Sequence, residues 1–153
     1  MGSGPSVERD APATAVREDG LRFRVTGPKG DVVSDMARSV GGAESAPSPG
    51  WLLRAALASC DATLIAIEAE RQGVELTELE VTVDSDSDSR GLRGEDDAVP
   101  PGPLTVRVHI RVAAGNADKD QLRALVERAE SRSPVRDAVG REVPLSTEIV
   151  VAD

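Results

Sequence analysis

Apolar and polar side chains alternate over several stretches of the chain, and this period of two predicts β-strands. Residues 21–26 and 31–36 alternate on either side of a Gly-Pro-Lys-Gly turn, which predicts an N-terminal hairpin. Residues 76–84 and 104–112 alternate in the same way, and we expect these two strands to pair with acidic side chains beside basic ones. Residues 145–151 predict a last strand near the C-terminus.

Three other segments predict helices. Residues 51–72 contain neither Gly nor Pro and are apolar nearly all round over their first two-thirds, which predicts a long buried helix ended by Gly73. A second helix is expected after Asn116 or Asp118, since either residue can cap it. Its apolar stripe consists of Leu122, Leu125, Val126 and Ala129. A short helix is expected over residues 135–139. Hairpin strands with segregated helices favour an α+β fold.

The organisation along the chain predicts a single folded domain. Residues 1–14 are rich in Gly, Pro, Ser and Ala and lack any periodicity, so we expect a disordered tail there. Residues 15–153 are expected to form the domain, because 153 residues fall within the usual size range and suffice for a core. The N-terminus has no apolar segment typical of a secretion signal, so we expect a cytoplasmic protein.

Composition excludes several classes of function. A net charge of −9 and the presence of one Trp, one Phe and no Tyr argue against a nucleic-acid-binding protein. No stretch approaches about 18 consecutive apolar residues, so no membrane partner is expected. One Cys and one His exclude an internal disulfide and a Cys-based zinc site, and we expect neither a metal nor another cofactor. His109, flanked by arginines, is expected to be solvated or ion-paired.

The single cysteine, Cys60, allows two interpretations. It belongs to a stripe with spacings of four and three residues that consists of Leu53, Leu57, Cys60, Leu64 and Ile67. A free cysteine on such a stripe commonly packs as a small apolar side chain. A reactive thiol would instead need an electropositive and partly open environment, which the neighbouring Asp61 does not supply.

Several motifs resemble those of the OsmC/Ohr family, the osmotically inducible and organic hydroperoxide resistance proteins. Residues 47–62, PSPGWLLRAALASCDA, resemble the first cysteine motif of this family. Residues 129–135, AESRSPV, resemble its second cysteine motif, A-E-x-x-C-P-V. Residues 20–28 resemble the N-terminal hairpin of the family, and residues 88–102 resemble the segment between its middle strands. The likeness covers about residues 16–152, with the motifs in the order that the family has.

This resemblance implies an α+β, OsmC-like fold in which antiparallel sheets surround a long buried central helix. It also implies that two subunits intertwine as a homodimer with the active sites at their interface. The family's peroxidases use a peroxidatic cysteine, a resolving cysteine and an Arg–Glu pair. The first cysteine corresponds to Cys60, whereas the position of the second holds Ser133 and that of the glutamate holds Gly50. Arg38 is a possible partner for the thiolate.

Two functions therefore remain open. The first is a one-cysteine reductase of organic or other small hydroperoxides that uses Cys60 and an external thiol reductant. The second is a non-catalytic OsmC-like dimer, binding a small ligand or associated with stress, in which Cys60 is a buried structural thiol. Ser133 is either a hydroxyl donor aimed at Cys60 or the N-cap of the short helix. Arg132 and Arg136 are further candidates for a thiolate partner, and Trp51 is expected to be an interface or pocket-wall anchor.

Overall fold

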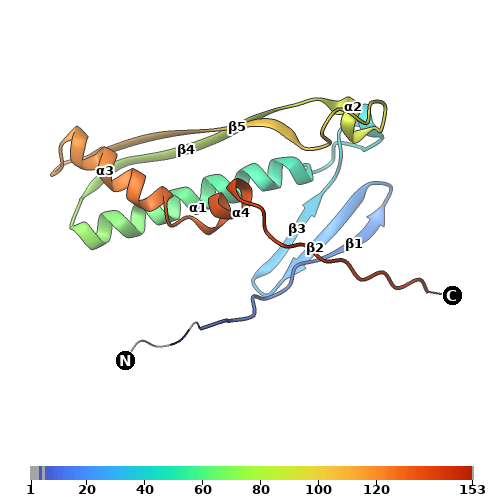
Figure 1. Ribbon diagram of the computed structural model, residues 1–153, viewed down its shortest axis with the longest axis horizontal. Helices are drawn as coiled ribbons and strands as arrows, with labels where there is room; N and C mark the ends of the chain where they lie inside the picture. Colours follow the sequence, from blue (N-terminus) through green and yellow to red (C-terminus); the bar gives the residue numbers. More distant parts are fainter. Residues whose placement is uncertain (1–3, 5, 153) are drawn as a thin grey trace. The chain divides into compact units, whose positions relative to one another are not determined.

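The structure is a computed structural model that describes residue 4 and residues 6–152. The chain forms two compact units, one with the residues up to Leu53 and the other with those from Arg54 onward (Figure 1). Each unit is described by itself. The N-terminal segment predicted to be a tail lies partly outside the described residues, which omit positions 1–3 and 5.

The N-terminal unit contains a three-stranded antiparallel sheet. Its strands are β1 (Thr14–Asp19), β2 (Arg22–Gly27) and β3 (Gly30–Ser34), in the order β1-β2-β3. The predicted hairpin is confirmed, because β2 and β3 pair across the Gly27–Gly30 turn. β1 was not predicted. All of its side chains are exposed, so no apolar alternation marks a strand that forms through backbone pairing with β2.

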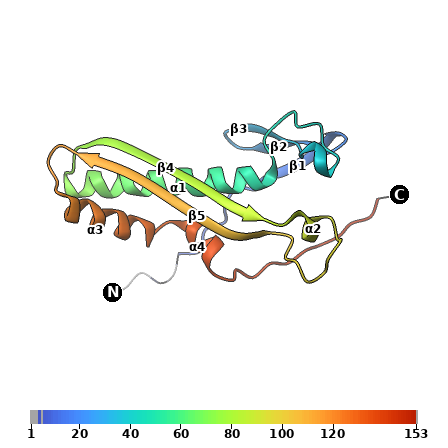
Figure 2. The same cartoon turned by 90° about the horizontal axis from the view of Figure 1, so that it is seen from above.

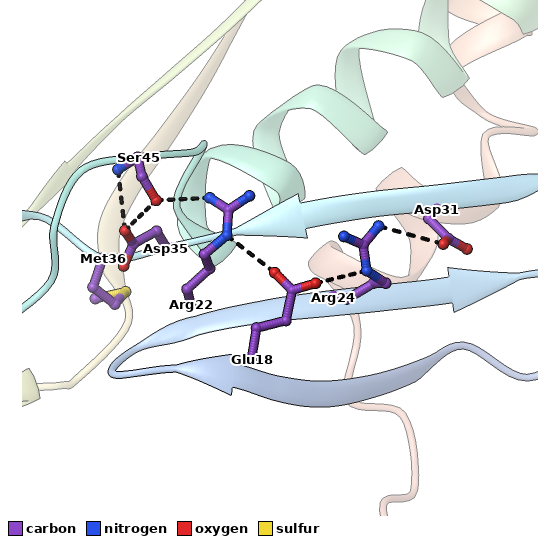
Figure 3. Close-up of polar contacts among 7 residues, drawn as sticks. All are labelled: Glu18, Arg22, Arg24, Asp31, Asp35, Met36 and Ser45. Carbon is purple, nitrogen blue, oxygen red and sulfur yellow. Dashed lines mark hydrogen bonds and ion pairs between the residues drawn. The ribbon is translucent and has the colours of Figure 1, made fainter.

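A carboxylate network holds the loop after β3 against β2, as Figure 3 shows. The carboxylate of Asp35, which is almost completely buried, accepts hydrogen bonds from the N–H of Met36 at 2.8 Å and from the N–H and hydroxyl of Ser45 at 3.0 and 2.7 Å. The Ser45 hydroxyl in turn accepts a hydrogen bond from Arg22 at 2.7 Å. Gly42 lies in the same loop, and a Cβ there would approach the Met36 carbonyl oxygen to 1.8 Å, so only glycine fits.

This network predicts a loss of stability in acid. Hydrogen bonds from the hydroxyl and N–H of Ser45 lower the pKa of Asp35 from its ordinary value of 3.8 to about 2. A lowered folded-state pKa stabilises the fold above the unfolded value, and this stabilisation is lost as the pH falls from 3.8 toward 2. Unfolding measured across this range should therefore depend less steeply on pH in Asp35→Asn than in the original chain. Asp86 and Asp88, whose pKa values are also about 2, should contribute in the same range in both proteins, and equal slopes would contradict the prediction.

The C-terminal unit contains most of α1 together with a long hairpin and three further helices. The elements in chain order are α1 (Pro49–Gln72), β4 (Leu76–Ser87), α2 (Ser89–Leu92), β5 (Pro103–Ala114), α3 (Lys119–Glu130) and α4 (Pro134–Gly140). The three predicted helices are confirmed as α1, α3 and α4. Gly73, with a φ of +66°, follows α1, and Asp118 caps α3 by accepting the N–H of Gln121 at 2.8 Å.

Strands β4 and β5 form the predicted antiparallel pair with acidic side chains beside basic ones. Asp84 lies opposite Arg107, and Thr82 lies opposite His109. Arg107 forms ion pairs with Asp84 and Asp86, and Nε2 of the exposed His109 lies 3.2 Å from Oδ2 of Asp84. β4 extends three residues beyond its predicted end, and β5 extends one residue before its predicted start and two beyond its predicted end.

The core of this unit lies where α1 packs against α3 and the β4–β5 hairpin (Figure 2). The buried side chains at its centre are Ile65, Ala69, Leu125 and Ala129. Partly buried side chains of both strands pack around them, namely Leu76, Leu79, Val81 and Ile110. Aliphatic residues therefore build this core without an aromatic side chain.

The sequence predicts a long buried helix over residues 51–72, and within the chain α1 is buried along one side. Its buried residues are Leu57, Asp61, Ile65, Glu68 and Ala69, a face about one residue around the helix from the predicted stripe. Leu53 and Ile67 of that stripe are exposed, the latter by 39%, and Trp51 is 49% exposed. Within the C-terminal unit, the hairpin and α3 cover only one side of the helix, so its other apolar side is exposed in that unit.

By length and composition, α1 could also cross a membrane. An 18-residue stretch of it has a mean hydropathy of 1.4, and 17% of that stretch is buried. Helices that pack in the core of a folded unit meet the same criterion, and α1 packs in this way through Ile65 and Ala69. The buried Asp61 and its ion pair with Arg136 lie midway along the helix. Length and composition are thus weak grounds for a membrane span.

The predicted strand over Leu145–Val151 is wrong. Residues 142–152 have no regular secondary structure, and Figure 1 draws them as a red coil beyond α4. Leu145, Ile149 and Val151 are almost fully exposed. Alternation predicts a strand only where another strand offers its free edge, and no described strand pairs with this segment.

Candidate functional site

Cys60 lies in the middle of α1 and is half-buried in the chain. The hydroxyl of Ser133 donates a hydrogen bond to its sulfur, with 3.3 Å between Oγ and Sγ. These two residues are 73 positions apart and come from different helices. The pair that the sequence proposed for the site therefore meets in space.

Ser133 combines the two roles that the sequence left as alternatives. It is the N-cap of α4, and its Oγ accepts a hydrogen bond from the backbone N–H of Arg136 at 3.4 Å. Pro134 follows as the first helical residue, a position where its missing N–H costs nothing. Because the oxygen accepts the capping hydrogen bond, its own proton remains available to the Cys60 sulfur. Ser133 is 2% exposed, so water does not compete for that proton.

An ion bridge lies beside this pair and joins three helices. Nη2 of Arg136 on α4 contacts Oδ2 of Asp61 on α1 at 2.7 Å, and the same nitrogen contacts the carboxylate of Glu130 at the end of α3. Asp61 is 0% exposed and directly follows Cys60. One guanidinium thus compensates two carboxylates, so the Asp61–Arg136–Glu130 bridge carries a net charge of −1.

Two polar atoms of this bridge have no hydrogen-bond partner among the described residues. They are Oδ1 of Asp61 and Nε of Arg136, and both are buried. A buried carboxylate oxygen that lacks a partner costs free energy, about 1–3 kcal/mol or more for a charged group. The bridge therefore stabilises the fold less than its short contacts suggest.

A second buried carboxylate, that of Glu68, lies two turns further along α1 and forms an ion pair with Arg132. Its carboxylate accepts a hydrogen bond from Gln72 at 2.8 Å and lies 3.6–3.7 Å from Arg71, Arg128 and Arg132. Arg132 was a candidate partner for the thiolate, but its described ion pair is with Glu68. Of the candidate arginines, Arg136 is the one that contacts residues adjoining Cys60.

Arg38, the other candidate, lies in the N-terminal unit. It forms the short helix η1 (Arg38–Val40) with the two residues after it, and its side chain is highly exposed. Its ion pair is with Glu44 at 3.5 Å. Its role as a thiolate partner stays a prediction.

A groove between β5 and α3 approaches the ion bridge. Its volume is about 470 Å³, and aliphatic and charged side chains line it in equal number. Its lining residues are Ile110, Val112, Lys119, Leu122, Arg123, Val126, Glu127 and Glu130. Glu130 belongs both to this groove and to the ion bridge, which connects an apolar surface with the surroundings of Cys60.

The described part of the chain contains no group of three or more His, Cys, Asp or Glu side chains that could hold a metal ion. The side chains around Cys60 contribute a thiol, a hydroxyl, a guanidinium and two carboxylates.

Sequence reasoning missed Asp61 and Glu130. Asp61 had a detectable signal, because a single carboxylate within the apolar part of α1 cannot be buried without a partner. That partner, Arg136, lies 75 positions away, and no spacing rule connects the two. Glu130 lies within the AESRSPV motif, but its contact with Arg136 depends on the turn between α3 and α4.

Comparison with known protein families identifies the chain. The family model described as OsmC-like protein matches residues 41–148. The chain belongs to the OsmC-like family. The resemblance inferred from its two cysteine motifs is thereby confirmed, and so is the α+β fold with a long central helix and antiparallel sheets. No curated protein matches the OsmC-like chain in a sequence comparison.

Solved structures with the OsmC-like fold agree with this assignment. An organic hydroperoxide resistance protein from Legionella pneumophila is 21% identical, with a TM-score of 0.63, and the match covers 88% of this chain and 91% of that one. An OsmC-like protein from Mycoplasma pneumoniae is 13% identical, with a TM-score of 0.72 and coverages of 88% and 89%. A putative organic hydroperoxide resistance protein from Vibrio cholerae, with captopril bound in one of its active sites, is 21% identical, with a TM-score of 0.56 and coverages of 88% and 88%.

Proposed function

We propose that this OsmC-like protein is a thiol-dependent hydroperoxide reductase with Cys60 as its peroxidatic residue. The observation that supports the proposal is the hydrogen bond from the Ser133 hydroxyl to the Cys60 sulfur. A hydrogen bond donated to sulfur favours the charged thiolate, which is the nucleophilic form of cysteine. The names of several relatives in the fold comparison point to hydroperoxides as the substrate class.

In the first step, the Cys60 thiolate attacks the terminal oxygen of the hydroperoxide. An S–O bond forms and the O–O bond breaks. The departing alkoxide takes up a proton and leaves as an alcohol, and Cys60 becomes a sulfenic acid. The sulfur is oxidised by two electrons and the peroxide is reduced by two.

In the second step, an external thiol reduces the enzyme. Ser133 occupies the position of the family's second cysteine and cannot form a disulfide, so a low-molecular-weight thiol attacks the sulfenic sulfur and releases water. A second thiol molecule then attacks the mixed disulfide, which frees Cys60 and releases the oxidised reductant. The cycle consumes one hydroperoxide and two thiols, and it yields an alcohol, water and one disulfide.

The groove between β5 and α3 favours an organic hydroperoxide over hydrogen peroxide. Burial of an alkyl chain against aliphatic lining residues such as Ile110 and Val126 is favourable by about 25 cal/mol per Å² of apolar surface. Glu130 connects this groove with the ion bridge beside Cys60. An alkyl chain bound in the groove would therefore lie next to Glu130, the residue that also contacts Arg136.

We further propose that the functional form is a cytoplasmic homodimer that binds no membrane. The uncovered side of α1 exposes Leu53 and Ile67, and Trp51 is exposed on another side of the helix, in its first turn. Exposed apolar side chains along a helix are typical of a surface that another protein covers. A second copy of the chain would cover this side of α1. A cytoplasmic location would supply the low-molecular-weight thiols that the cycle consumes.

The activity can be tested by measuring the consumption of cumene hydroperoxide with dithiothreitol as the reductant. We expect turnover by the original chain and, in Cys60→Ser, a loss of at least about a hundredfold, because a serine hydroxyl is not ionised at neutral pH. Omission of dithiothreitol should limit the reaction to one equivalent of peroxide. Equal rates for the two proteins would contradict the proposal.

A non-catalytic OsmC-like dimer remains the second candidate. The two ion pairs of Arg136 favour it. Because Asp61 and Glu130 already compensate the charge of this guanidinium, it would stabilise a nearby thiolate only weakly. In this case Cys60 would be alkylated slowly in the folded protein, and Cys60→Ala would fold with unchanged stability. The original chain and Cys60→Ala would consume peroxide at the same low rate.

A further inference from the structure

We propose that the Asp61–Arg136–Glu130 bridge sets the reactivity of Cys60, with Arg136 as a positioning residue and Glu130 as a restraint on its charge. The inference deepens the proposed function and rests on it in one respect only, namely that Cys60 reacts as a nucleophile. It assigns a role to two residues, Asp61 and Glu130, that the proposed cycle does not use.

The positioning role follows from two contacts of Arg136, one made by its backbone and one by its side chain. Its backbone N–H donates to Ser133 Oγ at 3.4 Å, and its side chain contacts Asp61 at 2.7 Å. Asp61 is the next residue after Cys60 on α1. Arg136 therefore holds the start of α4 against the turn of α1 that carries the sulfur, and this keeps the Ser133 hydroxyl 3.3 Å from Sγ.

The electrostatic role follows from the number of charges in the bridge. Asp61 and Glu130 contribute two negative charges and Arg136 contributes one positive charge, so the sum beside Cys60 is −1. Asp61 is 0% exposed and Arg136 is about one-third exposed, so water screens these charges less than it screens surface pairs. A net negative charge opposes formation of a thiolate. Removing the charge of Glu130 would make the sum neutral, whereas removing that of Arg136 would make it −2.

The two residues can therefore be separated by the sign of their effects. Glu130→Gln leaves the 2.7 Å contact between Arg136 and the buried Asp61 in place, so the positioning role survives while the restraint disappears. Arg136→Gln removes both the contact with Asp61 and the positive charge. A purely structural bridge would respond in the same direction to both substitutions, because each one breaks a contact.

The test measures the rate at which iodoacetamide alkylates Cys60 in the full chain at neutral pH, a reaction in which the thiolate displaces iodide and no peroxide takes part. We expect alkylation to be about threefold faster in Glu130→Gln and about tenfold slower in Arg136→Gln. Arg136→Lys, which retains the charge, should recover part of the rate. High salt should reduce the effect of Glu130→Gln, since screening weakens interactions between charges.

Two matched controls are available in the same region of the chain. Asp120→Asn removes an exposed carboxylate from α3 that has no described ion pair. Arg141→Gln removes a guanidinium whose described ion pair is with the exposed Asp137. Both controls should leave the alkylation rate unchanged. Should Arg136→Gln fail to fold, the comparison of Glu130→Gln with Asp120→Asn still decides the matter.

The inference is overturned if alkylation in Glu130→Gln is unchanged or slower than in the original chain. It is supported if Glu130→Gln is faster, whether or not the protein reduces peroxides. Peroxide turnover without these alkylation differences would leave the proposed function standing and remove this inference. The expected alkylation differences without turnover would do the reverse.

Discussion

Replacing Ser133 with cysteine should turn a one-cysteine site into a two-cysteine site. Oγ of Ser133 lies 3.3 Å from Sγ of Cys60, and both side chains point toward one another from adjacent helices. A small rotation of either side chain would bring a sulfur at this position within bonding distance. On addition of one equivalent of cumene hydroperoxide to S133C, the introduced thiol should attack the sulfenic acid of Cys60, release water and form a disulfide. Titration of free thiols should show that both are lost.

The disulfide should also stabilise the protein by several kcal/mol. It would join two positions that are 73 residues apart, and the loss of chain entropy in the unfolded state corresponds to about 4 kcal/mol for a loop of this length. Thermal unfolding of oxidised S133C should therefore occur at a clearly higher temperature than that of the reduced protein. The difference should disappear when dithiothreitol is added.

The control for this prediction is S131C, which introduces a thiol two residues earlier. Ser131 is exposed, and its hydroxyl contacts the carbonyl oxygen of Arg128 at 2.7 Å rather than Cys60. This variant should keep its introduced thiol after peroxide treatment and should not gain thermal stability. If S133C also keeps two free thiols, then either Cys60 does not reach the sulfenic acid or the 3.3 Å contact does not persist in solution.

The second large effect is expected at Ile65. This residue is 0% exposed and lies in the core cluster with Ala69, Leu125 and Ala129. Ile65→Ala removes buried methyl and methylene groups and leaves a cavity, which costs about 3 kcal/mol of unfolding free energy. Chemical denaturation followed by far-ultraviolet circular dichroism should show a lower midpoint at every protein concentration.

Ile67 is the matched comparison on the same helix. It is 39% exposed and lies on the uncovered side of α1. If a second copy covers that side, the unfolding midpoint of the original chain rises with protein concentration, and Ile67→Ala weakens this dependence. A midpoint that is independent of concentration in both proteins would contradict the homodimer. An Ile65→Ala variant as stable as Ile67→Ala would contradict the assignment of the core.

The sequence predicted those parts of the fold whose pattern is set locally. Alternation identified β2, β3, β4 and β5, and the absence of Gly and Pro identified α1. Alternation did not identify β1, because a strand with six exposed side chains is defined by backbone pairing alone. It wrongly predicted a strand over residues 145–151, because alternation says nothing about whether a neighbouring edge is free.

The candidate site was predictable only where a motif carried it. Cys60 and Ser133 were proposed from the two cysteine motifs, and their side chains are in contact. The bridge beside them was not found, since it depends on α3, α4 and α1 converging at one nitrogen of Arg136. Contacts of this kind are created by tertiary packing, and their distance along the chain hides them from any local pattern.

The position of the one tryptophan has a practical consequence for spectroscopy. The chain has a single Trp and no Tyr, so its near-ultraviolet absorbance and fluorescence come almost entirely from Trp51. That side chain is 49% exposed at the start of α1, in the N-terminal of the two units. An emission spectrum therefore reports on the surroundings of the first turn of α1. It does not report directly on the hairpin, α3 or Cys60.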